Sequence, residues 1–176
     1  LETIRDLYQD ILVGQQSKEL REIAYTDSLT NIKNRNAFIS DTKDIELNEL
    51  IIIAFDLNSL KYYNDNFGHD KGDKLIIGMA EILKKVFGDK AYRIGGDEFI
   101  IVGVGIDKNR FKAVMNKLCL MIEDSKLPYE NEMVGIRISI GVSEMITDHI
   151  NTYKELYEKA DEQLYKAKEA GKGCVR

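Results

Sequence analysis

The sequence has few of the residues that mark secreted, zinc-binding or membrane-spanning chains. Its two cysteines, Cys119 and Cys174, have neither the spacing of zinc ligands nor that of a disulfide framework, so we expect a reducing, cytoplasmic compartment. No apolar run approaches the ~18 residues of a transmembrane helix, and no signal-peptide pattern is visible. We therefore expect a domain that makes no membrane contact.

Positive charge is not in excess either. The chain has 25 Lys and Arg against 30 Asp and Glu, a formal net charge of −5. Because duplex binding usually needs a basic surface, this balance argues against a nucleic-acid partner, although a local basic pocket for one nucleotide remains compatible with it. The length of 176 residues and the apolar content of 44% fit one globular domain with a sizeable core.

Proline occurs once in the whole chain, and the first 26 residues have none. In this stretch Leu1, Ile4, Tyr8 and Ile11 follow the spacing of a short coiled-coil seam. Two interpretations stay open: a linker helix that pairs with a second chain, or an amphipathic helix packed on its own domain. Since the pattern is already under way at the first residue, we expect residues 1–26 to be a linker from an upstream sensor domain and 27–176 to be the functional domain.

Helical and strand patterns interleave along the rest of the chain. The glycine pair within 91–104 predicts a hairpin, and a hairpin requires antiparallel pairing. We therefore predict an α+β two-layer sandwich, with a central, mostly antiparallel sheet flanked by helices. The predicted helices cover 34–46, 59–67, 70–87, 108–126 and 152–170, and the predicted strands cover 50–56, 91–104 as the hairpin, and 134–145.

Acidic residues stand at the ends of two of these strands. Asp56 ends the apolar run LIIIAFD, and Asp97 and Glu98 follow the glycine pair of the hairpin. Each acid alone would be explained as a solvated loop residue. If the two strands are neighbours, however, the carboxylates meet at one end of the sheet, and hard oxygen ligands of this kind suit Mg²⁺ bound together with a phosphate.

Four motifs, in order, resemble those of the GGDEF family, the diguanylate cyclases, whose fold is that of the nucleotidyl cyclases and polymerase palms. The likeness extends over residues 27–172, nearly the whole chain after the first helix. The motifs are DSLTNIKNR (27–35), DLNSLKYYNDNFGHDKGDKLI (56–76), GGDEF (95–99) and ADEQLYKAKEAGK (160–172).

This resemblance implies the reaction and the metal site. Two GTP molecules would be condensed into cyclic di-GMP with release of two pyrophosphates, in a homodimer whose two sites face each other. Asp56, Asp97 and the backbone carbonyl of Leu57 would bind Mg²⁺ (or Mn²⁺), and Glu98 would join a second ion or orient its water. Asp97 is also the family's proton acceptor, and Lys61 would neutralise charge on the phosphates.

The resemblance also implies a guanine site made by Asn64 and Asp73. A carboxylate at position 73 can accept hydrogen bonds from N1–H and the 2-amino group of guanine, whereas adenine lacks that amino group. His69 is expected near the substrate, with packing or capping as the alternative role.

Basic residues in the last motif would bind the triphosphate. Lys168 and Lys172 are four residues apart on the final helix and face one way, although a solvated basic face would have the same pattern. Arg93, just before the glycine pair, is a further candidate for a phosphate contact, or else pairs with a surface acid.

The sequence departs from the family pattern at two notable positions. Asn58 stands where the second acid of D-x-D is common, which keeps an oxygen and loses a charge. In VFGD (86–89) Asp89 remains, but Val86 replaces the arginine of the family's inhibitory R-x-x-D motif. We predict weak or absent product inhibition, because the anionic product loses its guanidinium anchor.

A second function class stays open. A catalytically silent module of this family would bind GTP or cyclic di-GMP and signal by its conformation. Such modules usually lose a signature acid, whereas this chain keeps GGDEF and lacks the inhibitory arginine. We therefore favour an active cyclase, the cytosolic output domain of a larger protein with or without a membrane anchor.

Overall fold

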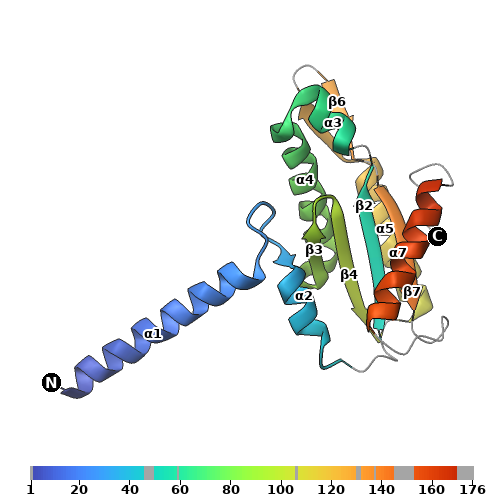
Figure 1. The fold of residues 1–176 in the computed structure, drawn as a ribbon. Coiled ribbons are helices and arrows are strands. Elements are labelled where there is room, and N and C mark those ends of the chain that lie inside the picture. The colour runs from blue at the N-terminus through green and yellow to red at the C-terminus, as the bar shows by residue number, and fades with distance from the viewer. Residues whose placement is uncertain are drawn as a thin grey trace.

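A computed structural model gives the fold. The N-terminal helix extends away from a body in which helices surround one sheet (Figure 1). The structure describes residues 2–45, 50–58, 60–105, 107–129, 132–136, 138–144 and 153–169.

The element order agrees in outline with the predicted one. In chain order the elements are α1 (Glu2–Tyr25), β1 (Lys33–Asn34), α2 (Arg35–Thr42), β2 (Leu50–Leu57), α3 (Leu60–Phe67), α4 (His69–Phe87), the 3₁₀ turn η2 (Gly88–Lys90), β3 (Ala91–Gly95), β4 (Glu98–Val104), α5 (Lys108–Glu123), β5 (Lys126–Tyr129), β6 (Glu132–Gly135), β7 (Ile138–Glu144) and α7 (Tyr153–Glu169).

The main sheet has five strands in the order β1-β3-β4-β2-β7. β2 pairs antiparallel with both β4 and β7, β3 pairs antiparallel with β4, and only the two-residue β1 runs parallel to its neighbour β3. Every residue of β2 is buried, as expected for a continuous apolar run. The prediction of an α+β fold with a mostly antiparallel sheet is confirmed.

Helices cover both faces of this sheet, whereas a two-layer sandwich would have a single helical layer. Alternate residues of β2 explain the arrangement, because side chains along a strand point to opposite faces. Ile51, Ile53 and Phe55 pack with α4 and α5, while Ile52 and Ala54 pack with α2 and α7.

Two predictions in the second half of the chain were wrong in their bounds. Helix α5 ends at Glu123, and Pro128 lies within β5, which pairs with β6 in a separate two-stranded sheet. The predicted strand 134–145 is two strands, β6 and β7. Its alternation continues across the break, so the period-2 pattern does not reveal where the chain changes sheets.

Helix α1 stands clear of the domain and touches it mainly near α2 (Figure 1). Seven of its large apolar side chains are 50% to 77% exposed, so the alternative of a helix packed on its own domain is not what the structure has. No helix within the described part of the chain is long and apolar enough to span a membrane. The exposed apolar residues of α1 include Ile4, Leu7, Tyr8, Ile11, Leu20 and Ile23.

Candidate active site

The predicted metal ligands meet where β2 ends beside the tip of the β3–β4 hairpin. In the register of β2 and β4, Asp56 lies directly opposite Glu98. The next backbone N–H, that of Leu57, donates a hydrogen bond of 3.2 Å to the carbonyl oxygen of Asp97. Asp56 is only 7% exposed, Asp97 is half-buried and Glu98 is exposed. Acids more than 40 residues apart in the sequence are thus brought to one end of the sheet.

The hairpin turns tightly because of its glycines. Gly96 has a φ of 49°, in the left-handed region that residues with a Cβ rarely adopt. The register of β3 with β4 shifts between Arg93 and Gly95, and Gly95 then pairs with Glu98. This irregularity makes Gly96 and Asp97 the tip of the hairpin next to Asp56, with Gly96 exposed and Asp97 half-buried.

Helices α3 and α4 pack together at the same end of the sheet (Figure 1). Asn64 and Gly72 lie close together, because a Cβ on the glycine would be 1.9 Å from Asn64 Oδ1. That oxygen is buried and has no hydrogen-bond partner within the described residues. Asp73, the next residue of α4, is half-buried. The two predicted guanine-binding residues therefore lie in adjoining turns, and an unsatisfied acceptor of this kind suits a polar ligand.

The other predicted residues of these two helices are exposed. Lys61 is the second residue of α3, and His69 is the first residue of α4, directly after Gly68, whose φ is 83°. Their roles in substrate binding stay predictions.

Substituting Gly72 by alanine tests the Asn64 contact. The new Cβ would displace the Asn64 amide, while alanine in place of a helical glycine favours the fold by about 1 kcal/mol. We expect KM for GTP to rise about tenfold with a melting temperature at or above that of the wild type, measured by steady-state kinetics and thermal denaturation. Gly14→Ala in α1, where nothing lies within 4 Å of the added atom, is the matched control. An unchanged KM would remove Asn64 from the substrate site.

Helix α7 brings its C-terminal end toward the same end of the molecule (Figure 1). Its buried residues Ala160 and Leu164 lie on Gly141 of β7, and a Cβ at Gly141 would be 2.2 Å from the Ala160 carbonyl oxygen. Lys168 follows Leu164 by one helical turn within α7. The prediction for Lys172 falls outside the described residues.

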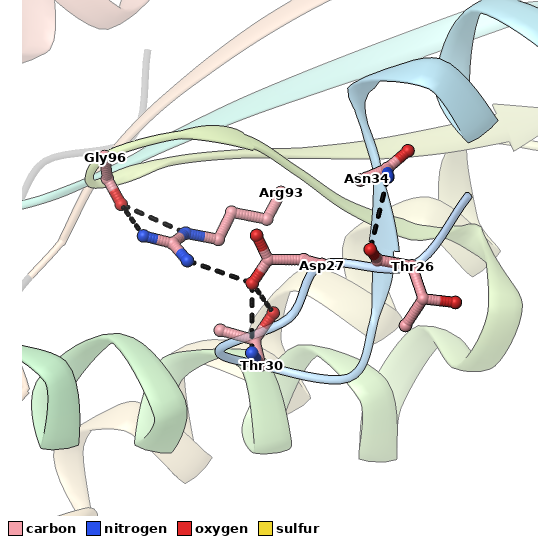
Figure 2. Close-up of polar contacts among 6 residues, drawn as sticks. All are labelled: Thr26, Asp27, Thr30, Asn34, Arg93 and Gly96. Carbon is pink, nitrogen blue, oxygen red and sulfur yellow. Dashed lines mark hydrogen bonds and ion pairs between the residues drawn. The ribbon is translucent and has the colours of Figure 1, made fainter. Parts of the chain in front are cut away.

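Arg93 is held by protein groups (Figure 2). Its Nε and Nη2 donate to the carbonyl oxygen of Gly96, at 3.2 and 2.9 Å, and its Nη1 donates to Asp27 Oδ1 at 2.9 Å. The same carboxylate oxygen accepts hydrogen bonds from the backbone N–H and the hydroxyl of Thr30. The Arg93 side chain is 12% exposed. These contacts hold the hairpin turn at Gly96 in place. The phosphate contact of Arg93 stays a prediction.

The Asp27 carboxyl is tuned by these contacts. Burial alone raises its pKa, but the hydrogen bonds from Thr30 and Arg93 and the charge of Arg93 outweigh burial, so the pKa lies below the usual value for aspartate. A pKa lowered in the folded state gives stability that is present above the unfolded value of about 4 and is lost as the pH falls through the folded value.

Asn34 makes the second tie in this region. Its Nδ2 donates to the carbonyl oxygens of Ala24 and Thr26, at 3.0 and 3.2 Å, and its Oδ1 accepts from the backbone N–H of Ala37 at the start of α2 (Figure 2 shows the Thr26 contact). The motif DSLTNIKNR (27–35) carries these contacts, although no residue within it was predicted to have a role. The Asp at its start and the Asn near its end were the signal for these contacts.

Breaking the ion pair with Asp27→Asn is expected to lower the free energy of unfolding by about 1–2 kcal/mol and turnover about tenfold, because Arg93 loses its charged partner and the turn at Gly96 loosens. Chemical denaturation and GTP turnover measure the two effects. Asp44→Asn, which alters an exposed carboxylate 3.8 Å from Lys43, is the control. Turnover equal to that of the control would contradict a positioning role for Arg93.

Asn58, the departure from D-x-D, is buried beside β7. Ser139 donates a hydrogen bond of 3.0 Å to its Oδ1, and its Nδ2 has no partner within the described residues. Ser139 also pairs with Asp56 across the β2–β7 ladder. Asn58 therefore continues the buried polar end of β2 on which Asp56 stands.

Comparison with known proteins decides the family. A sequence model described as "Diguanylate cyclase, GGDEF domain" matches residues 24–174. The chain belongs to this family. The matched range begins at the end of α1 and contains every predicted site residue, so the convergence of β2, the hairpin, α3 and α4 lies within the GGDEF domain.

Relatives and solved structures agree with this assignment. The domain is 28% identical over 93% of its length to "Diguanylate cyclase A" of Treponema denticola, and 30% identical over 97% to "Diguanylate cyclase DgcS" of Shewanella oneidensis. It spans 47% and 58% of those two proteins, about half of each. Its fold is also that of the coiled coil and GGDEF domain of DgcB from Caulobacter crescentus, solved in complex with c-di-GMP. The TM-score is 0.85 with 23% identity over 99% of this chain and 96% of the other.

Proposed function

We propose that this GGDEF domain condenses two GTP molecules into cyclic di-GMP. The observation that carries the proposal is the meeting of Asp56, Leu57 and the Asp97–Glu98 tip at the end of the sheet where α3 and α4, which carry Asn64 and Asp73, pack together (Figure 1). In each half-reaction the 3′-oxygen of one GTP forms a bond to the α-phosphorus of the other. The bond from that phosphorus to the β-phosphate oxygen breaks, and pyrophosphate leaves with the electron pair.

The residues at the end of β2 fit a divalent cation that arrives with a triphosphate. Among the described residues no three His, Cys, Asp or Glu side chains form a group able to hold a metal ion. A site with fewer protein carboxylates suits Mg²⁺ or Mn²⁺, because phosphate oxygens and water complete the coordination. Asp56, Asp97 and the Leu57 carbonyl would bind the ion, with Glu98 beside them. The chemistry that such an ion supplies is polarisation of the phosphate being attacked.

The protein groups then divide the remaining work. Asp73 and Asn64 accept and donate hydrogen bonds at the guanine edge, which selects GTP over ATP. Lys61 and Lys168 offset phosphate charge, with Lys172 assigned by the resemblance. A carboxylate oxygen of Asp97 takes the proton of the attacking hydroxyl. Arg93 holds the turn that carries Asp97 through its bonds to Gly96.

Catalysis needs two domains, because each binds one GTP and contributes half of the product. The exposed apolar residues of α1 support pairing through this helix, since large apolar side chains at 3–4-residue spacing are the usual seam of a two-helix coil. In the proposed dimer α1 brings the two sites face to face, and an upstream sensor domain would act through it.

The test is GTP turnover with Mg²⁺, following pyrophosphate and cyclic di-GMP over a range of protein concentrations. A rate that rises faster than linearly with protein concentration is expected of an enzyme that works as a dimer. Absence of product at high concentration calls for a second sample, in which a cysteine near the start of α1 links two chains. Continued silence there, with GTP still bound, would favour the silent binding module.

We expect added cyclic di-GMP to leave the initial rate unchanged. Val86 is half-buried, packs against the apolar core and has no hydrogen-bond donor for an anion, and Asp89 lies in the exposed η2 turn. The neighbouring Lys84 donates to the Asn31 carbonyl oxygen at 3.2 Å instead. Val86→Arg is expected to introduce inhibition by product. Strong inhibition of the wild type would contradict the prediction drawn from VFGD.

A further inference from the structure

A cavity of about 380 Å³ lies at the end of the sheet opposite the candidate active site. It is bounded by the start of β2, the end of β4, the end of α4 and the start of α5. Its volume is within the range of small-molecule sites, about 300–1,000 Å³. Apolar side chains make most of its lining, chiefly Ile51, Ile53, Ile101, Val86, Phe87 and Phe111.

Two cations also line this cavity. Arg110, in the first turn of α5, is exposed, and its side chain makes no ion pair or hydrogen bond within the described residues. Lys90 is exposed as well, but its charge also acts on the Asp41 carboxyl. Arg110 is therefore the better candidate to bind an anion in the cavity. The neighbouring Asp107 caps α5, where its Oδ1 accepts from the backbone N–H groups of Asn109 and Arg110. Its negative charge is therefore directed at the helix start.

We propose that this cavity binds a small amphiphilic carboxylate with an apolar chain. The chain would lie on the isoleucine floor, and burial of its methylene groups would supply most of the affinity. The carboxylate would meet Arg110 and Lys90 in charge-assisted hydrogen bonds. A nucleotide fits the lining less well, because its ribose and base edge would face Ile51, Ile53 and Ile101, which have no hydrogen-bonding groups.

The site has a physical connection to the rest of the domain. Val86 and Phe87 form the last turn of α4, and Gly72 and Asp73 lie in its first turns. A helix of 19 residues is about 28 Å long and moves largely as one body. Any effect of the carboxylate on GTP turnover rests on the proposed function, whereas its binding does not.

The probe is decanoate, titrated below its micellar concentration into the ¹³C-methyl-labelled protein and followed by NMR. Saturable shifts are expected for the methyl groups of Ile51, Ile53, Ile101 and Val86, and 1-decanol should bind at least tenfold more weakly. Arg110→Gln is expected to raise the Kd about tenfold. Lys117→Gln, which removes an exposed charge further along α5, should leave it unchanged.

Three results would overturn the assignment. Shifts confined to Ile4, Ile11 and Ile23 would mean that decanoate only coats the exposed face of α1. Equal binding of decanol, or of decanoate by Arg110→Gln, would remove the role of the cations. Shifts of the same cavity methyls by cyclic di-GMP at lower concentration would make the site one for nucleotides. Because all these readouts are of binding, an inactive cyclase would leave the result intact.

Discussion

Replacing Asp56 by asparagine is expected to lower GTP turnover by about 10²–10³-fold, because the substrate phosphates lose an anionic ligand for their cation. Asparagine has nearly the same shape, and it removes a charge from a side chain that is only 7% exposed. The small change of shape should leave the fold intact. Single-turnover kinetics with saturating GTP and Mg²⁺ would separate the loss of chemistry from a loss of binding.

The matched control for this substitution is Asp124→Asn, which makes the same chemical change at an exposed position after α5. It should retain full activity. If Asp56→Asn lowers the melting temperature, Asp97→Asn at the hairpin tip supplies a second variant with less effect on the core. Retention of a tenth or more of the activity by both variants would show that these carboxylates do not hold the metal.

Replacing Gly141 by alanine is expected to cost about 2–3 kcal/mol of the free energy of unfolding, or a fall of ~5–10 °C in melting temperature. A single methyl group has this effect because the atoms it meets are backbone. The new Cβ would lie 2.2 Å from the Ala160 carbonyl oxygen and 2.3 Å from the Leu164 nitrogen. Neither can move away without shifting α7 from the sheet.

The consequence for activity follows from the same displacement. Lys168 stands one turn beyond Leu164, so a shift of α7 displaces this proposed phosphate-binding residue, and we expect a higher KM for GTP in the folded fraction. Gly14→Ala places the same methyl group in α1, where it meets nothing within 4 Å. If Gly141→Ala and the wild type had the same melting temperature, α7 would have to pack less closely on β7 than it does in the structure.

The parts of this fold that the sequence predicted are those set by local periodicity. The run LIIIAF has no polar position before Asp56, so it predicted a buried strand, and Gly95-Gly96 predicted a hairpin. Asp56 and Asp97 lie at one end of the sheet, as expected if the two strands are neighbours, because each stands at the end of such an element. Their role as metal ligands stays a prediction. Once the strands are known to pair, their ends must meet.

The rest depends on partners chosen over long distances. Arg93 contacts Asp27, 66 residues away, and nothing in the local pattern of either residue specifies the other. The same holds for Gly141 and α7, and for Ser139 and Asn58. The break between β6 and β7 was missed because both strands alternate in the same sense. Helix α1, by contrast, was predicted from its periodic apolar face. Whether that face packs on a second chain or on its own domain was left open, because the periodicity does not identify what covers it.

The hydrogen bonds at the C-terminal end of α1 couple a tilt of this helix to the hairpin turn at Gly96. Asn34 bonds to Ala24 and Thr26 at the end of the helix, and the next residue, Asp27, holds the arginine that grips Gly96. A 24-residue helix is about 36 Å long, so a tilt of about 5° at its C-terminal end corresponds to ~3 Å at its far end. Conversely, a displacement of several ångströms at the N-terminal end of α1 corresponds to a movement of only a few tenths of an ångström at the hairpin turn of Gly96 and Asp97. That is the scale on which the alignment of a reacting oxygen and a phosphorus atom is decided.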